Sequence, residues 1–89
     1  MNNQYDNYYI ARTVVNGYVV STVKLTDLFG IHVGGEYETM VFPADANGEV
    51  ADWLERDCQR YGNMEAALEG HEVMVAAWAL VASTPTVVS

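Results

Sequence analysis

The sequence predicts an α+β domain in which an antiparallel sheet of three to four strands is covered on one face by one long C-terminal helix. Three observations predict this fold: an Asn-Gly pair between two apolar segments, alternating apolar and polar residues further along, and a helical repeat of apolar residues near the C-terminus. The chain has 89 residues, of which 51% are hydrophobic, which is enough for one modest core. We therefore expect residues 1–89 to form a single domain, with loose ends at 1–7 and 83–89.

The first two strands are predicted by the pair Asn16-Gly17. Both residues tolerate the positive φ angles that a type I′ turn requires, so they favour a hairpin with a two-residue turn. We expect strands at about 8–15 and 18–25, with the residues on either side of the turn facing each other. In this register, we assign one set of side chains to the face that contacts the helix: Tyr8, Ile10, Val14, Val19, Val23 and Leu25.

A loop and a third strand are expected after the hairpin. The glycines of residues 26–35 indicate turns, and the alternation of residues 36–43 predicts a strand. Pro43 ends this strand, and the polar residues 44–49 predict a turn. We assign Val41 to the helix-contacting face.

Residues 50–61 fit two patterns. Their apolar side chains suit a helical stripe, but the alternation within the segment also suits a strand with charged residues between apolar ones. We favour a strand at about 55–61, because Gly62 follows it and a separate helix signal begins directly afterwards.

The C-terminal helix has a clear predicted start and end. Asn63 is a good N-cap, and Glu65 suits the positive end of the helix dipole. The helix should stop near Ala82, because Pro85 cannot continue it. The core-facing stripe is expected to contain the apolar residues that recur at spacings of three and four, together with one histidine: Met64, Leu68, His71, Val75 and Trp78.

The order of short motifs in the chain resembles that of a group of small uncharacterised phage proteins. The motifs are ETMVF at residues 38–42, RY at 60–61, EA at 65–66 and GH at 70–71. The resemblance covers about residues 18–76 and implies a phage origin and a strand that ends in RY. The group has no assigned activity, so the resemblance implies no catalytic residues.

Composition narrows the possible partners and location. The formal net charge is −8, and the few basic residues are not clustered, so direct binding to a nucleic-acid backbone is not expected. No apolar run approaches the roughly 18–20 residues of a membrane span. The start of the chain lacks the basic and apolar regions of a signal peptide, so we expect a cytoplasmic location in the host cell.

The sequence does not favour catalysis, a metal or a cofactor. His71 lacks a second metal ligand at a helical spacing of three or four, so we expect a buried imidazole that is hydrogen-bonded to a strand or loop. His32 lies in a glycine-flanked loop and is expected to be solvated. Cys58 cannot form an internal disulfide, and its acidic neighbours raise a thiol pKa, so we expect it to be buried and inert. Glu38 is expected to pair with an arginine of the next strand.

The expected fold leaves one sheet face without a helix, and apolar side chains on such a face usually mark an interface. We assign six residues to it as interface candidates: Tyr9, Val15, Tyr18, Val20, Met40 and Phe42. Covering by the 26–35 loop and the tail is the alternative.

The leading functional hypothesis is a non-enzymatic phage accessory protein that acts as a homodimer and binds a host or phage protein. One alternative is an acidic mimic of nucleic acid that blocks a host defence enzyme, with these residues in place of phosphates: Asp45, Glu49, Asp52, Glu65, Glu69 and Glu72. A small-molecule-binding oligomer is a further alternative. A hydrolase would require a closed pocket that holds a histidine beside a carboxylate.

Overall fold

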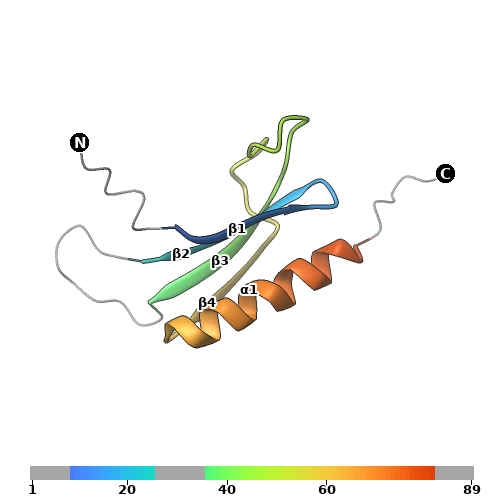
Figure 1. The fold of residues 1–89 in the computed structure, drawn as a ribbon. Helices are drawn as coiled ribbons and strands as arrows, with labels where there is room; N and C mark the ends of the chain where they lie inside the picture. The colour runs from blue at the N-terminus through green and yellow to red at the C-terminus, as the bar shows by residue number, and fades with distance from the viewer. Residues whose placement is uncertain (1–8, 26–35, 82–89) are drawn as a thin grey trace.

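The computed structural model describes residues 9–25 and 36–81, and expectations for residues 1–8, 26–35 and 82–89 lie outside this range. Four strands form one antiparallel sheet in the order β1-β2-β3-β4, and a single helix packs against it (Figure 1). The predicted α+β fold is therefore confirmed. The elements are β1 (Tyr9–Val15), β2 (Tyr18–Lys24), β3 (Tyr37–Pro43), β4 (Asp57–Tyr61) and α1 (Met64–Ala79).

The β1–β2 hairpin forms as predicted. Asn16 and Gly17 have φ angles of 53° and 80°, and Val15 pairs with Tyr18 across the turn. The Asn16 side-chain amide also donates hydrogen bonds to the carbonyls of Trp78 and Val81, at 3.0 and 2.6 Å. The turn residue therefore also satisfies carbonyl groups at the C-terminal end of the helix, where intrahelical donors run out.

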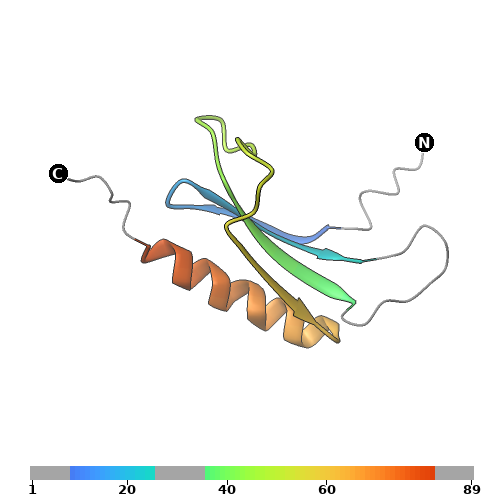
Figure 2. The same cartoon turned by 180° about the vertical axis from the view of Figure 1, so that it is seen from behind.

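The ambiguous segment of residues 50–61 contains a strand, as favoured, but a shorter one. Asp57–Tyr61 pairs with β3, and residues 50–56 belong to neither a helix nor a named strand. Residues 44–56 instead form an irregular excursion that returns to the sheet at β4, visible above the strands in Figure 1 and from behind in Figure 2. We call it the 44–56 segment.

The helix begins as predicted and ends three residues early, at Ala79 instead of Ala82. The Asn63 side chain caps it by accepting a 2.7 Å hydrogen bond from the Ala66 amide. The predicted stripe is only partly correct. Its first two members, Met64 and Leu68, are 41% and 46% exposed. The buried helix residues are Ala67, His71 and Met74.

For the β1–β2 hairpin, the helix contacts the sheet face opposite to the one we assigned, whereas Val41 lies on the helix-contacting face as predicted. Val20, Val41 and Met74 form the buried core, and Val15, Tyr18, Val75 and Trp78 pack against it. The pairing of Val20 with Val41 puts these two residues on one face, so Val19 belongs to the other. The assignment failed because neighbouring hairpin positions are valine on both faces, so alternation alone does not show which face the helix covers.

Within the part of the chain that the structure describes, no helix combines the length and apolar character needed to cross a membrane.

Candidate protein-binding surface

The sheet face opposite α1, which we call the open face, is partly covered by the chain itself. The 44–56 segment folds against it, and the Trp53 ring packs edge-on against Phe42, with ring centroids 5.2 Å apart. Phe42 is 7% exposed and Val19 is fully buried. The expectation of an uncovered apolar face is therefore wrong for the middle of the sheet, because Phe42 and Val19 are sheltered by their neighbours and by the segment.

The six predicted interface residues do not form one surface. Val15, Tyr18 and Val20 were placed on the wrong face, since they lie beneath α1 in the core. Phe42 is on the predicted face but buried, and Met40 is half-buried. Tyr9, at 54% exposed, is the only one of the six that is largely accessible.

Tyr9 reaches the open face because of an irregularity in β1. The register of the β1–β2 pair shifts between Tyr9 and Ala11, which reverses the alternation at the start of the strand. Tyr9 and Trp53 consequently line the same hollow of about 160 Å³. The bulge thus brings a tyrosine from β1 to the tryptophan of a distant segment.

Four apolar side chains on and around the open face are exposed to solvent. Trp53 and Leu54 are 72% and 69% exposed, and Tyr9 and Val14 are 54% and 47% exposed. Val14 lies near the turn of the 44–56 segment, within reach of a Cβ placed at Gly48. We call Tyr9, Val14, Trp53 and Leu54 the open-face patch.

A polar clamp orders the turn that carries the two most exposed members of the patch. Asp52 accepts a 3.0 Å hydrogen bond from the Leu54 amide and a 3.2 Å ion-pair contact from the Arg56 guanidinium. Arg56 also donates to the Leu54 carbonyl at 2.5 Å. The Leu54 amide and the Arg56 guanidinium lower the pKa of Asp52. Trp53 and Leu54 therefore lie on a turn that is already ordered before a partner binds. Pre-ordering lowers the conformational entropy that the turn would lose on binding.

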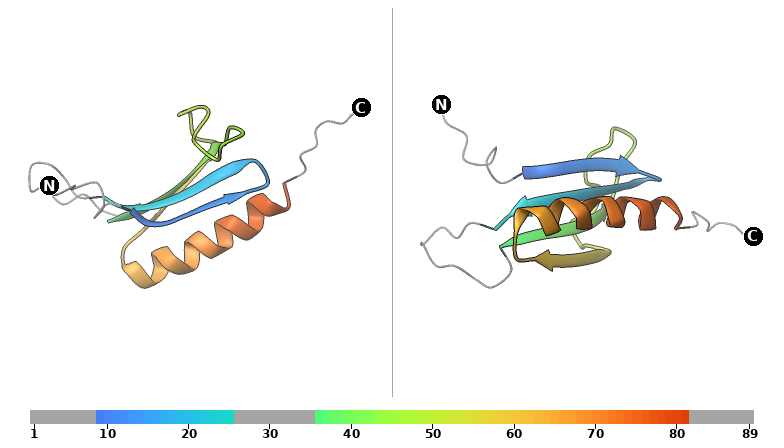
Figure 3. Two further views of the ribbon diagram at one scale, coloured as in Figure 1. Left: turned by 45° about the horizontal axis from the view of Figure 1, so that its top comes forward. Right: turned by 60° about the horizontal axis from the view of Figure 1, so that its bottom comes forward.

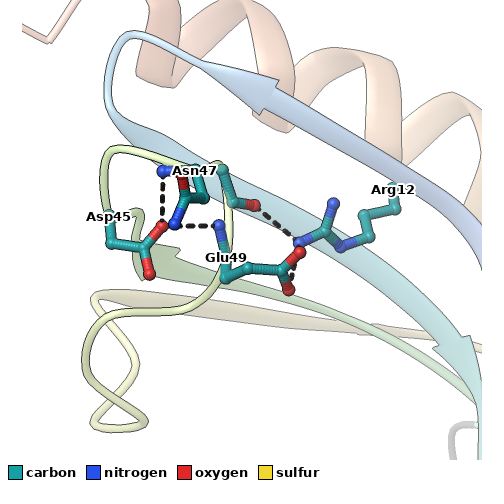
Figure 4. Close-up of polar contacts among 5 residues, drawn as sticks. Arg12, Asp45, Asn47 and Glu49 are labelled. Carbon is teal, nitrogen blue, oxygen red and sulfur yellow. Dashed lines mark hydrogen bonds and ion pairs between the residues drawn. The ribbon is translucent and has the colours of Figure 1, made fainter.

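The other half of the segment is ordered by a second set of polar contacts (Figure 4). Asp45 accepts hydrogen bonds from the amides of Asn47 and Glu49, at 2.8 and 3.0 Å. Arg12 of β1 donates to the Gly48 carbonyl at 2.8 Å and lies 3.8 Å from the Glu49 carboxylate. These contacts tie the segment to the edge strand of the sheet.

The six predicted acidic residues fall into two separate groups. Asp45, Glu49 and Asp52 belong to the 44–56 segment, whereas Glu65, Glu69 and Glu72 are exposed on α1, on the other side of the sheet (Figure 1). The segment carboxylates make the turn and arginine contacts described above. The structure therefore does not bring the six carboxylates into one continuous row.

His71 is part of the core, as expected. It is 1% exposed, and its Nδ1 and Nε2 atoms lie 2.7 Å from Thr22 Oγ1 and 2.9 Å from Thr13 Oγ1. Thr22 Oγ1 is in turn 2.5 Å from Thr39 Oγ1. Burial lowers the pKa of His71, against a smaller raising effect of Glu72. The ring joins the helix to three strands through hydroxyl groups, and no carboxylate shares its hydrogen bonds.

Cys58 differs from its prediction in exposure but not in reactivity. Its side chain is exposed, because β4 is an edge strand of the described sheet. Desolvation and a 3.2 Å hydrogen bond to Glu38 raise the pKa of this thiol to about 11. Glu38 also forms the predicted cross-strand ion pair, with Arg60 at 3.1 Å. The high pKa argues against a nucleophilic role.

A groove of about 510 Å³ runs between β4 and α1. Its walls include Tyr61, Val73 and Met74, with the carboxylates of Asp57 and Glu69. Asp57 is held in place, since it accepts hydrogen bonds from the Trp78 indole at 3.0 Å and from the Cys58 amide at 2.8 Å. Among residues 9–25 and 36–81, no group of three or more potential ligand side chains is suited to hold a metal ion. His32 lies outside this range.

Comparisons with models of protein families, with curated proteins and with solved structures gave no match.

Our sequence reasoning missed Trp53 and Leu54 as surface residues. The available signal was an adjacent apolar pair flanked by Asp52 and Glu55, in a segment without a clear helical or strand period. Flanking charges of this kind favour solvent exposure of the segment as a whole.

Proposed function

We propose that this protein is a non-enzymatic phage accessory protein that acts by binding a host or phage protein through the open-face patch. The observation that carries the proposal is the exposure of Trp53 and Leu54, at 72% and 69%, on a turn ordered by Asp52 and Arg56. The phage origin is supported by the motif resemblance alone.

The patch is large enough to contribute to binding. Aromatic side chains present about 150–250 Å² each, so Trp53 and Tyr9 at 72% and 54% exposed leave on the order of 250 Å² accessible. Covering that area would be worth roughly 6 kcal/mol before the costs of association. Tryptophan and tyrosine are also enriched among the residues that dominate interface energies.

The environments of His71 and Cys58 support a binding role over a catalytic one. Both ring nitrogens of His71 are occupied by threonine hydroxyls beneath the helix, where no substrate can reach them without local opening. The exposed thiol of Cys58 has a raised pKa and a carboxylate neighbour, which is the opposite of an activated nucleophile.

The acidic-mimic alternative receives less support from the geometry. A mimic requires carboxylates spaced along one accessible surface, whereas the six candidates are divided between α1 and the 44–56 segment. The two hypotheses also differ in salt dependence, because a mimic loses affinity steeply with added salt and an apolar interface does not.

A comparative capture experiment tests the proposal. Immobilised protein is exposed to lysate of a bacterial host, and retained proteins are identified for wild type, the Trp53→Ala/Leu54→Ala variant and the control Val73→Ala. Val73 is 68% exposed on α1, where it lines the groove beside β4 on the side of the sheet opposite the open-face patch, so it matches Trp53 in exposure but not in location.

We expect a protein that wild type and Val73→Ala retain and the double variant loses, at both about 0.05 and 0.5 M salt. Retention that survives the double substitution would contradict the proposed surface. Retention that disappears at the higher salt concentration would favour the acidic mimic.

A second candidate function, small-molecule binding, is favoured by the groove between β4 and α1. Its volume of about 510 Å³ lies within the range of ligand pockets, and its apolar walls carry two carboxylates. A fragment screen by ligand-observed NMR, compared with a Val73→Trp variant that fills the groove, tests it. Hits that bind both proteins equally would exclude this site.

A further inference from the structure

We propose that the groove between β4 and α1 binds a small organic cation, namely a protonated amine attached to an apolar body. The inference rests on the second candidate function, small-molecule binding in this groove, and deepens it by naming the class of ligand. The groove lies on the side of the sheet that α1 covers, opposite the open-face patch (Figure 3 shows the helix on one side of the sheet and the 44–56 segment on the other).

The groove carries negative charge that no basic side chain of the protein offsets. Among the described residues, its lining includes the carboxylates of Asp57 and Glu69 and no lysine, arginine or histidine. All lysine and arginine residues of the sequence lie in the described part of the chain, and each contacts a group outside the groove: Arg12 pairs with Glu49, Arg56 with Asp52 and Arg60 with Glu38, and Lys24 lies 6.0 Å from the centre of the Tyr37 ring. A lysine or arginine of the chain therefore does not supply the positive charge that this groove lacks.

Asp57 gives the groove a carboxylate of fixed orientation. It accepts a 3.0 Å hydrogen bond from the Trp78 indole and a 2.8 Å hydrogen bond from the Cys58 amide. Both donors are uncharged, so they hold the carboxylate in place without neutralising it, and its remaining lone pairs can accept hydrogen bonds from an ammonium group. This fixed acceptor distinguishes the groove from the general negative charge of a chain whose formal net charge is −8.

The walls of the groove suit a cation with an apolar body better than a hydrated metal ion. Ala66, Val73 and Met74 of α1 contribute apolar surface, and Val73 is 68% exposed. Tyr61 of β4 adds an aromatic ring, which Gly70 of α1 allows to lie close to the helix. Aromatic rings attract organic cations through their faces, and a volume of about 510 Å³ suits a small organic molecule. The groove therefore offers a contact for each part of an apolar amine.

Addition of a peptide strand is the other use of such a groove, because β4 is an edge strand of the described sheet. An added strand requires main-chain donors and acceptors of β4 that are still free. The Cys58 amide already donates to the Asp57 side chain, so this donor is not available to an added strand. The strand is also only 5 residues long. These two observations favour a small ligand over a peptide.

The test is a titration of the isotope-labelled full chain, followed by two-dimensional NMR, with two probes of the same shape. Naphthylmethylamine carries a positive charge at neutral pH, and naphthylmethanol is its uncharged counterpart. We expect the amine to bind roughly tenfold more tightly than the alcohol, because only the amine forms charge-assisted hydrogen bonds with the groove carboxylates. The amide signals that shift should belong to residues 57–61 and 66–74, which contribute the two walls.

Three variants locate the binding site of the amine. Asp57→Asn should weaken amine binding by roughly tenfold and leave alcohol binding unchanged, because it removes the charge and keeps an acceptor oxygen. Glu69→Gln should weaken amine binding several-fold, and since Glu69 is exposed, this variant keeps the fold even if Asp57→Asn disturbs the contact with Trp78. Glu72→Gln is the matched control, because it removes the same charge from an exposed position of α1 outside the groove, and it should bind the amine like wild type.

Several outcomes would overturn the inference. Equal affinity for the two probes would remove the preference for a cation and leave small-molecule binding standing. A loss on Glu72→Gln as large as that on Asp57→Asn would show that the amine is attracted by the acidic chain in general. Acetylated trilysine that binds more tightly than the amine would assign the groove to a peptide. None of these outcomes affects capture of a protein through Trp53 and Leu54, because the 44–56 segment lies on the other side of the sheet.

Discussion

The ring of Tyr61 lies directly over Gly70, so that a Cβ at this helix position would overlap the ring atoms. Tyr61 is the last residue of β4, and Gly70 lies in the middle of α1. A glycine in a helix interior costs about 1 kcal/mol relative to alanine. Here it allows the edge strand and the helix to approach each other closely.

Gly70→Ala should destabilise the protein by about 1–2 kcal/mol, because overlap with Tyr61 outweighs the gain in helix propensity. Urea denaturation measures the difference. In a Tyr61→Ala background the same substitution should be neutral or stabilising, since the overlapping ring is gone. A Gly70→Ala protein more stable than wild type would show that the ring moves aside at little cost.

Truncation of the two tryptophans should destabilise the protein to very different extents. Trp78 packs against Tyr18 with ring centroids 4.7 Å apart and donates a 3.0 Å hydrogen bond to Asp57, so Trp78→Ala should cost about 3–5 kcal/mol in unfolding free energy. Trp53→Ala should cost the monomer about 1 kcal/mol or less, because Trp53 is 72% exposed. Equal losses in denaturant unfolding at low protein concentration would refute this division of roles.

Stability should fall as the solution becomes mildly acidic, and His71 is the cause. Burial lowers its pKa below the ordinary value of 6.5, so above that pH both folded and unfolded states hold a neutral ring. As the pH falls from 6.5 through the lower folded-state pKa, the unfolded chain takes up a proton first, and stability is lost. Chemical denaturation between about pH 7.5 and 5.5 measures the loss.

His71→Gln is the matched control for the pH effect, since it keeps hydrogen-bonding groups without the titration. The variant should be less stable than wild type, with a flatter pH profile across the same interval. A His71→Gln profile as steep as that of wild type would assign the acid sensitivity to other groups.

Cys58 should react slowly with alkylating reagents despite its exposure. Its pKa of about 11, against an ordinary 9.0, reduces the thiolate fraction at pH 8 by roughly 100-fold. Mass spectrometry of iodoacetamide labelling, with an unstructured cysteine peptide as reference, measures the rate. Glu38→Gln should accelerate labelling because it removes a neighbouring negative charge; an unchanged rate would contradict this explanation of the raised pKa.

The local elements of the fold were predictable because short-range signals determine them. The Asn16-Gly17 pair fixed the hairpin and its register, and Asn63 marked the start of the helix. The assignment of faces was not predictable, because Val14, Val15, Val19 and Val20 make both sides of the hairpin apolar. Only the tertiary packing of the helix distinguishes the two sides.

The surface patch was less predictable than the fold. Tyr9 reaches it through a register shift that has no clear marker in the sequence, and Trp53 reaches it through an irregular segment. The buried state of Phe42 depends on that segment, some ten residues away in the chain. Burial of this kind depends on nonlocal contacts, which periodicity does not report.

The central claim is that Trp53 is exposed in the isolated chain and becomes covered by a protein. Acrylamide quenching of Trp53 fluorescence in a Trp78→Phe protein, which leaves Trp53 as its only tryptophan, tests this claim most directly. We expect strong quenching of the isolated protein and marked protection when the captured target is added. Quenching that is equally strong under both conditions would contradict the account.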